Sequence, residues 1–325
     1  LAARVQLKLD AEFPRFTQHL LEMVYPHYLS PLPSMAVVQL EPDLTEGSLA
    51  EGFEVPRETT LLSLLGKGEQ TACEYRTAQE LTLWPLELVE AEYFTHAGPV
   101  VRTDLPALRQ SKGGVRLRLR TTAGLTFDKL SLNRLSLFLQ GGDDLPLRLH
   151  ELLLANPVAL VVQPVERPLP WCEVLDPSAI RPSGFAEEQA LLPYPPASFQ
   201  GYRLLHEYFA FPNRYLFVEL SGLQGALRRC PQTEIDLIVL LSRTDRDLDN
   251  RLDASHFALF CTPAINLFPK RCDRIHLSDR AAEYHLIPDR TRPMDFEVYR
   301  VDSVVGYGQG SQREQEFLPF YSAHD

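Results

Sequence analysis

Two cysteines and two histidines, Cys261, Cys272, His276 and His285, are the nearest that this sequence comes to a metal site. Thiolate sulfur and imidazole nitrogen are ligands that zinc favours. Structural zinc sites usually pair ligands two to four residues apart, whereas the successive separations here are 11, 4 and 9 residues. We therefore expect no bound metal, and we interpret these residues as buried thiols beside surface or hydrogen-bonded histidines.

Other patterns that would indicate catalysis or a cofactor are incomplete. A serine nucleophile elbow is absent, and the glycines of residues 306–310 lack the lysine and following helix of a phosphate-binding loop. The aspartates from Asp245 to Asp253 resemble a calcium loop, but Leu248 replaces the glycine that an EF-hand turn requires. We expect a solvated loop whose carboxylates are neutralised by interleaved arginines. These are Arg243, Arg246 and Arg251.

A run of alternating residues from Gly114 to Arg120 predicts a half-buried strand, because successive side chains of a strand point to opposite faces. The apolar set is Val115, Leu117 and Leu119, and the basic set is Arg116, Arg118 and Arg120. Such a basic face could bind an anion or nucleic acid. The whole chain, however, has a net charge of −11 and a pI near 5.4. We therefore favour a solvated or salt-bridged face, since nucleic-acid binding requires a basic surface.

The elements that position these residues belong to a globular chain of 325 residues, of which 45% are hydrophobic. This length exceeds what one core usually serves, so we expect more than one domain. No apolar run approaches the roughly 18 residues that a membrane helix requires. Five scattered cysteines without a C-x-x-C pair favour reduced thiols in a cytosolic compartment.

Residues 1–24 have the periodicity of an amphipathic helix, with apolar side chains at steps of three or four. Pro14 interrupts this pattern and predicts a kink or two helices, because proline lacks the amide donor. The sequence begins without a helix cap, so we expect an internal piece of a longer protein. An ordinary core helix is one interpretation, and a helix that binds a partner is the other. The candidate partner-binding face comprises Leu9, Phe13, Phe16, Leu20 and Met23.

The rest of the chain predicts an α+β fold that is β-rich and multi-domain, with this helical segment at its N-terminal end. Prolines crowd residues 164–200 and place a boundary there. We expect a helical assembly segment at 1–30, a β-rich domain with a short helix at 31–164, and a second β-rich α+β domain at 165–325. In the helix expected at 201–211, an apolar face should pack into a core. Its members are Tyr202, Leu205, Tyr208 and Phe209.

Several separated blocks of the sequence resemble one family. They are EFPRFTQHLLEMVYPHYLSPLPS in the first helical part, GYRLLHEYFAFPNRYLFVELSGL at 201–223 and CTPAINLF at 261–268. On these blocks the chain is similar to the TssF family, also called ImpG or VasA. Residues 52–61 also resemble in part a proline turn of phage baseplate wedge proteins. Glu58 stands where that turn usually has glycine, which puts a positive φ at this position in doubt.

The TssF resemblance implies a non-enzymatic role in the baseplate wedge of the bacterial type VI secretion system, beneath the contractile sheath. The partners that it implies are TssG, TssK, TssE, a second TssF copy and the spike hub, VgrG. The implied location is cytoplasmic, at the inner face of the cytoplasmic membrane. The residues alone leave a different class open, a metal-dependent hydrolase or a ligand-binding module that uses residues 256–307.

Overall fold

The computed structural model describes residues 2–43, 50–95, 106–194, 196, 198–278, 280–281, 283–308 and 314–317, and of residues 9–15 only the backbone. The chain divides into two compact units. We call Leu1–Pro33, Leu62–Glu74 and Leu267–Asp325 the helical unit, and Ser34–Leu61 with Tyr75–Asn266 the sheet unit.

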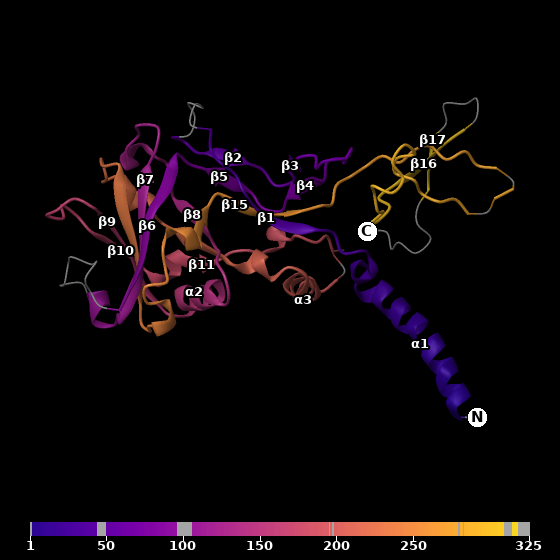
Figure 1. The fold of residues 1–325 in the computed structure, drawn as a ribbon, viewed down its shortest axis with the longest axis horizontal. Helices are drawn as coiled ribbons and strands as arrows, with labels where there is room; N and C mark the ends of the chain where they lie inside the picture. Colours follow the sequence, from indigo (N-terminus) through magenta and orange to yellow (C-terminus); the bar gives the residue numbers. More distant parts are fainter. Residues whose placement is uncertain are drawn as a thin grey trace. The chain divides into compact units, whose positions relative to one another are not determined.

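The largest sheet of the sheet unit is antiparallel, with the strand order β10-β9-β13-β7-β6 (Figure 1). Its strands are β6 (Leu86–Phe94), β7 (Gly113–Thr121), β9 (Pro157–Pro164), β10 (Glu173–Leu175) and β13 (Glu234–Leu241). The central strand β13 is buried from Ile235 to Leu241. Its nearly continuous apolar sequence is typical of a strand that is covered on both faces.

A second antiparallel sheet has the order β11-β12-β8-β14. Its strands are β8 (Arg134–Leu139), β11 (Ile180–Pro182), β12 (Phe217–Ser221) and β14 (Phe257–Leu259). Helix α2 (Leu145–Ala155) buries Leu145, Leu149 and Leu152, which recur at steps of four and three. These leucines belong to one hydrophobic cluster with residues of both sheets, so the two sheets and α2 share the main core.

Smaller elements complete the two units. A sheet of order β1-β15-β4-β3 is formed by β1 (Met35–Gln39), β3 (Thr60–Leu62), β4 (Glu74–Thr77) and β15 (Cys261–Ile265), and β2 (Phe53–Val55) pairs with β5 (Leu81–Leu83). The sheet unit also has helices α3 (Gln200–Ala210) and α4 (Gln224–Leu227). The helical unit contains α1 (Ala2–Val24), the 3-10 helix Pro26–Leu29, and the pair β16 (Val304–Tyr307) and β17 (Glu314–Phe317).

The structure confirms the expected α+β, β-rich fold with an N-terminal helix. Its grouping of residues differs from the expected boundary at 164/165. Strand β13 follows that boundary in the sequence, yet it lies between β9 and β7, which precede it. Backbone hydrogen bonds thus join the two sides, and the proline-rich stretch connects parts of one unit.

Two local expectations are corrected. Helix α1 continues through Pro14 as a single helix, so the expectation of two helices there is wrong. The lost hydrogen bond at one proline is compatible with a helix of 23 residues. Glu58, where we doubted a positive φ, has a φ of 67°. Its N–H donates to Thr77 O at 2.9 Å and its carbonyl accepts from Arg76 at 3.0 Å, which holds this left-handed conformation.

Candidate interaction surfaces

The candidate partner-binding face lies along α1, where its five residues follow one another at steps of 4, 3, 4 and 3. Phe16, Leu20 and Met23 are exposed. Leu9 and Phe13 are on the same helix, but their side chains lie outside the described residues. An average step of 3.5 residues is the heptad spacing of helices that pack along one another. This face therefore has the pattern of a helix–helix contact.

The four residues considered as metal ligands fall in different units. Cys261 is buried in β15 of the sheet unit, whereas Cys272, His276 and His285 belong to the helical unit. Among the residues that the structure describes, no three His, Cys, Asp or Glu side chains gather as metal ligands. The structure therefore gives no support to a metal-dependent hydrolase in residues 256–307.

Burial should protect two cysteines of the sheet unit from thiol reagents. It raises the pKa of Cys230 to about 11 and that of Cys261 to about 12, so both remain protonated at pH 8. The thiolate is the nucleophile, and Cys73 is exposed. Iodoacetamide labelling followed by mass spectrometry should modify Cys73 and leave Cys230 and Cys261 intact. In 6 M guanidinium chloride, used here as an unfolding control, all should react. Equal labelling of Cys261 and Cys73 in the folded chain would contradict this.

The arginines of β7 form the salt-bridged face that the sequence favoured. Arg118 donates to both carboxylate oxygens of Asp236 on β13, at 2.9 and 3.3 Å. Arg116 lies 2.6 Å from Glu90 and 2.7 Å from Glu92, both on β6. The hydrogen bond to Asp236 is the main cause that raises the pKa of Arg118. These guanidinium groups already have carboxylate partners, so they do not form an open anion site.

The acidic loop at 245–253 is neutralised differently from our expectation. Arg148 of α2, rather than the interleaved arginines, lies 2.7 Å from Asp247 and 3.4 Å from Asp245. Asp245 and Asp253 each cap a short 3-10 helix by accepting from the backbone. Leu248 and Leu252 of this loop are buried, whereas Asp247, Asn250, Arg251 and Asp253 are exposed.

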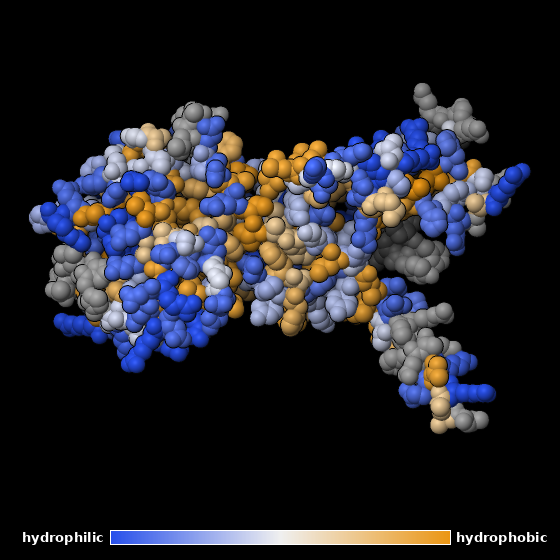
Figure 2. Space-filling model, viewed as in Figure 1, coloured by the Kyte–Doolittle hydropathy of each residue, from blue (hydrophilic) through white to orange (hydrophobic). Residues whose placement is uncertain are grey.

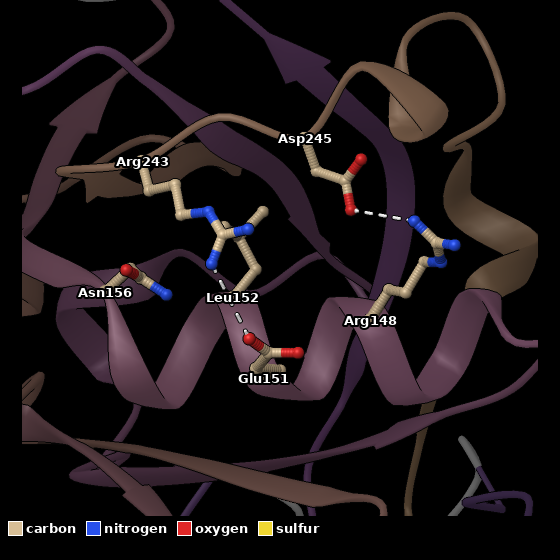
Figure 3. A pocket seen from close by; sticks show the side chains of 6 residues that line it. All are labelled: Arg148, Glu151, Leu152, Asn156, Arg243 and Asp245. Carbon is tan, nitrogen blue, oxygen red and sulfur yellow. Dashed lines mark hydrogen bonds and ion pairs between the residues drawn. The ribbon is translucent and has the colours of Figure 1, made fainter.

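A shallow cleft of about 310 Å³ lies between α2 and this loop (Figure 3). It is lined by Arg148, Glu151, Leu152, Asn156, Arg243 and Asp245. The two arginines extend toward carboxylates on the rim, Arg148 toward Asp245 and Arg243 toward Glu151 at 3.8 Å. Because the positive groups are compensated, the cleft has no uncompensated charge for an anionic ligand.

Helix α3 has the opposite orientation to the one that its apolar pattern predicted. Tyr202, Leu205, Tyr208 and Phe209 are exposed, and 80% of the Phe209 surface is accessible. The two charged residues of the helix, Arg203 and Glu207, are instead fully buried. The expected aromatic core at this helix is therefore wrong. The physical reason is an ionic cluster under the helix.

Glu207 lies between two arginines, and we call Arg203, Glu207 and Arg214 the buried ionic cluster. Arg203 Nη1 donates to Glu207 Oε2 at 3.0 Å, and Arg214 forms an ion pair with the same oxygen. Glu207 Oε1 accepts from the N–H groups of Leu191 and Leu192, each at 2.9 Å. Burial lowers the pKa of Arg214 to about 10, so this side chain is still charged at neutral pH.

Arg214, together with Arg57 from outside the cluster, holds the backbone of residues 184–192 by hydrogen bonds. Arg214 Nη2 donates to the carbonyl oxygens of Gly184 at 2.8 Å and Gln189 at 2.6 Å. Arg57 adds two hydrogen bonds of 2.8 Å, to the carbonyls of Glu188 and Ala190. Charge-assisted hydrogen bonds of this kind are stronger than neutral ones. The backbone beneath α3 is thus held in place by these hydrogen bonds, while the opposite face of the helix points to solvent.

Sequence reasoning missed this cluster, although one signal was present. Arg203 and Glu207 are four residues apart and so share a helix face. That spacing usually indicates an exposed ion pair, which is the reason why the aromatic residues seemed the better candidates for the core. The third charged residue, Arg214, lies beyond Pro212 and outside the helix, so the helical repeat does not include it.

These features define a β-rich protein with exposed apolar helix faces, a class typical of subunits of larger assemblies. A family model described as "Type VI secretion system, TssF" matches residues 1–325. The chain therefore belongs to the TssF family of the type VI secretion system.

Two comparisons agree with this assignment. The chain is 54% identical over its 325 residues to the type VI secretion system component TssF1 of Pseudomonas aeruginosa PAO1, covering all of this chain and 52% of that protein. A cryo-electron microscopy structure of a TssK-TssF-TssG baseplate subcomplex contains a similar chain, with a TM-score of 0.76 and 29% identity. That match covers 98% of this chain and 57% of the other. The chain thus spans about half the length of these relatives.

Proposed function

We propose that this chain acts as a structural subunit of a type VI secretion baseplate and that α1 contains one of its assembly faces. The family membership and the similarity to a baseplate subcomplex support this role. The observation that carries it is the heptad-spaced face of α1, on which Phe16, Leu20 and Met23 are exposed. Apolar helix faces of this kind are usually covered by another helix.

The proposed partners follow from the relatives. The solved subcomplex joins TssK, TssF and TssG, and we propose TssG and TssK as partners of this chain. The proposal extends to TssE, a second TssF copy and the spike hub VgrG, without a catalytic activity. The proposed place of assembly is the cytoplasm, at the inner face of the cytoplasmic membrane. Within the described ranges, no helix has the length and hydropathy needed to cross a membrane.

Replacing Phe16 and Leu20 together by aspartate should abolish co-purification with TssG while the sheet unit stays folded. Two carboxylates in the centre of an apolar helix contact would lose their hydration without gaining partners. The measurement is recovery of TssG on the tagged chain after co-expression, with circular dichroism to follow folding.

The matched control is the pair Ala11→Asp and Gln18→Asp, which adds the same two charges on the opposite side of α1. This control should retain TssG. Retention of TssG by the Phe16→Asp and Leu20→Asp variant would reject the assembly role of this face. Global unfolding of that variant, with a folded control, would instead favour the ordinary core helix.

A further inference from the structure

Strand β3 is the last strand of its sheet, and one of its sides is open. The sheet has the order β1-β15-β4-β3, so β3 has β4 on one side and no described strand on the other. Leu62, Leu64 and Leu65, at the end of β3 and just beyond it, are exposed, and 94% of the Leu64 surface is accessible. Figure 2 shows hydrophobic side chains on the surface around the position that β3 has in Figure 1. We call the backbone and side chains of Leu62 and Leu64 the β3 edge.

The hydrogen bonds to the returning strand determine which backbone groups of this segment are open. Ser63 N–H donates to Cys73 O at 2.9 Å, and the Ser63 hydroxyl accepts from Cys73 N–H at 2.9 Å. Because backbone groups alternate in direction along an antiparallel strand, those of Leu62 and Leu64 point away from the hairpin partner. Among the described residues, neither leucine has a backbone hydrogen bond to a residue outside the hairpin. The β3 edge thus presents N–H and C=O groups to solvent.

The sequence of this segment lacks the features by which proteins usually protect an open edge. Edge strands commonly carry a lysine, another charged residue, a proline or a bulge, each of which opposes pairing with a further strand. Residues 59–65 read TTLLSLL and contain neither a charged residue nor a proline. This edge is therefore suited to accept a strand.

Contacts within the helical unit hold the hairpin in place. Arg292 Nη1 donates to Gln70 O at 2.7 Å and lies 2.8 Å from Thr71 Oγ1. Thr71 also donates to Asp295. These bonds are made by the returning strand and leave the β3 edge uncovered. An edge that is ordered before binding loses less conformational entropy when a partner adds to it.

We propose that the β3 edge binds an extended segment of a partner protein, which adds to the sheet as a further strand. Open backbone groups select a strand and not a helix, because the backbone groups of a helix bond within the helix. Apolar side chains at alternate positions of the segment would cover the two leucines. The net charge of −11 favours basic residues between them and disfavours a second copy of this chain. This site is separate from the candidate partner-binding face of α1 and does not depend on it.

A short fluorescent peptide in which lysine and valine alternate tests the proposal. Fluorescence anisotropy should show saturable binding to the chain at physiological ionic strength. The control is the same peptide methylated on two adjacent central amides, which point to opposite edges, so it keeps every side chain and charge but loses donors on both edges. The control should bind about tenfold more weakly or worse. Equal binding of the two peptides would overturn the proposal, because charge alone would then explain the attraction to this acidic chain.

Leu62→Pro removes an outward N–H without removing a bond to the returning strand, so the hairpin should stay intact. This variant should weaken binding of the unmethylated peptide by about 20-fold or more. Leu62→Thr is the matched control, because it shortens the same side chain and keeps the N–H. It should weaken binding by no more than about fivefold, which corresponds to one cross-strand side-chain contact. Thermal melting should show that both variants are folded, and equal weakening by the two would contradict pairing through the backbone.

Hydrogen exchange followed by mass spectrometry locates the bound peptide. The peptide should slow amide exchange most strongly in residues 60–65, since the outward N–H groups of the β3 edge gain partners there. Protection confined to other segments would rule out this edge. If the chain alone were dimeric in sedimentation equilibrium and Leu62→Pro made it monomeric, the occupant would be a second copy and the proposed partner would be wrong. The variant with Phe16→Asp and Leu20→Asp should bind the peptide like the parent chain, so failure of the α1 proposal is distinguishable from failure of this one.

Discussion

Glu207→Gln should lower the free energy of unfolding by about 3–5 kcal/mol, because it removes the counter-charge of two buried arginines. Arg203 and Arg214 would remain in a site with zero exposure, next to each other and without a carboxylate. Glutamine keeps the size of the side chain and can still accept from the N–H groups of Leu191 and Leu192. The loss in unfolding free energy therefore reports mainly the removal of the negative charge. Urea denaturation followed by circular dichroism measures this loss.

Glu151→Gln is a suitable control for the same chemical change. Glu151 is exposed on α2, and its ion pair with Arg243 is long, at 3.8 Å. Exposed pairs contribute about 0–1 kcal/mol, so this variant should unfold almost like the parent chain. If both variants unfolded within 1 kcal/mol of each other, the cluster would not be the support of α3 that the structure indicates.

The orientation of α3 shows where sequence periodicity stops being sufficient. A helical repeat identifies two opposite faces, here one with Tyr202 and Leu205 and one with Arg203 and Glu207. It does not say which face is inside. The average preference of charged residues for solvent favoured the wrong one. The deciding residue, Arg214, is seven positions further along and reaches the cluster only through the fold.

Elements with a strong local signal were predictable. The strand with three arginines, the N-terminal helix and the helix expected at 201–211 occur close to the expected positions. The grouping of segments into units was not predictable, because the pairing of β13 with β7 and β9 joins segments that are far apart in the sequence. Glu58 is a similar case. Its left-handed φ is maintained by partners on β4, which local preference cannot include.

The pairing of the β7 arginines with the glutamates of β6 depends on an irregularity of β6 that the sequence alone does not reveal. The acidic residues of β6 are Glu87, Glu90 and Glu92, so strict alternation would place Glu87 and Glu90 on opposite faces. A register shift between Leu88 and Glu90 corrects this. Glu87 then stands opposite Arg120, Glu90 opposite Arg118 and Glu92 opposite Arg116. The irregularity of the strand thus completes the charge pairing.

Asp236→Asn should cost about 3 kcal/mol of unfolding free energy, because this carboxylate is buried and bonded to Arg118 through both oxygens. Asp236 is only 1% exposed, and Arg118, whose side chain is 23% exposed, would keep only Glu90, at 3.2 Å, as a carboxylate partner. Asparagine keeps the shape but offers one acceptor and no charge. Urea denaturation gives the difference, and the slope of the transition shows whether the native state is otherwise intact.

Glu87→Gln provides the comparison on the same face, since Glu87 and Arg120 are cross-strand partners that are both about half exposed. Water can replace the lost partner there, so the expected change is about 0.2–1 kcal/mol. In 1 M salt this small effect should shrink further, whereas the effect of Asp236→Asn should persist, because a buried pair is screened less. Equal losses of unfolding free energy for the two variants, or a loss for Asp236→Asn that disappears in salt, would show that burial does not determine how strong these ion pairs are.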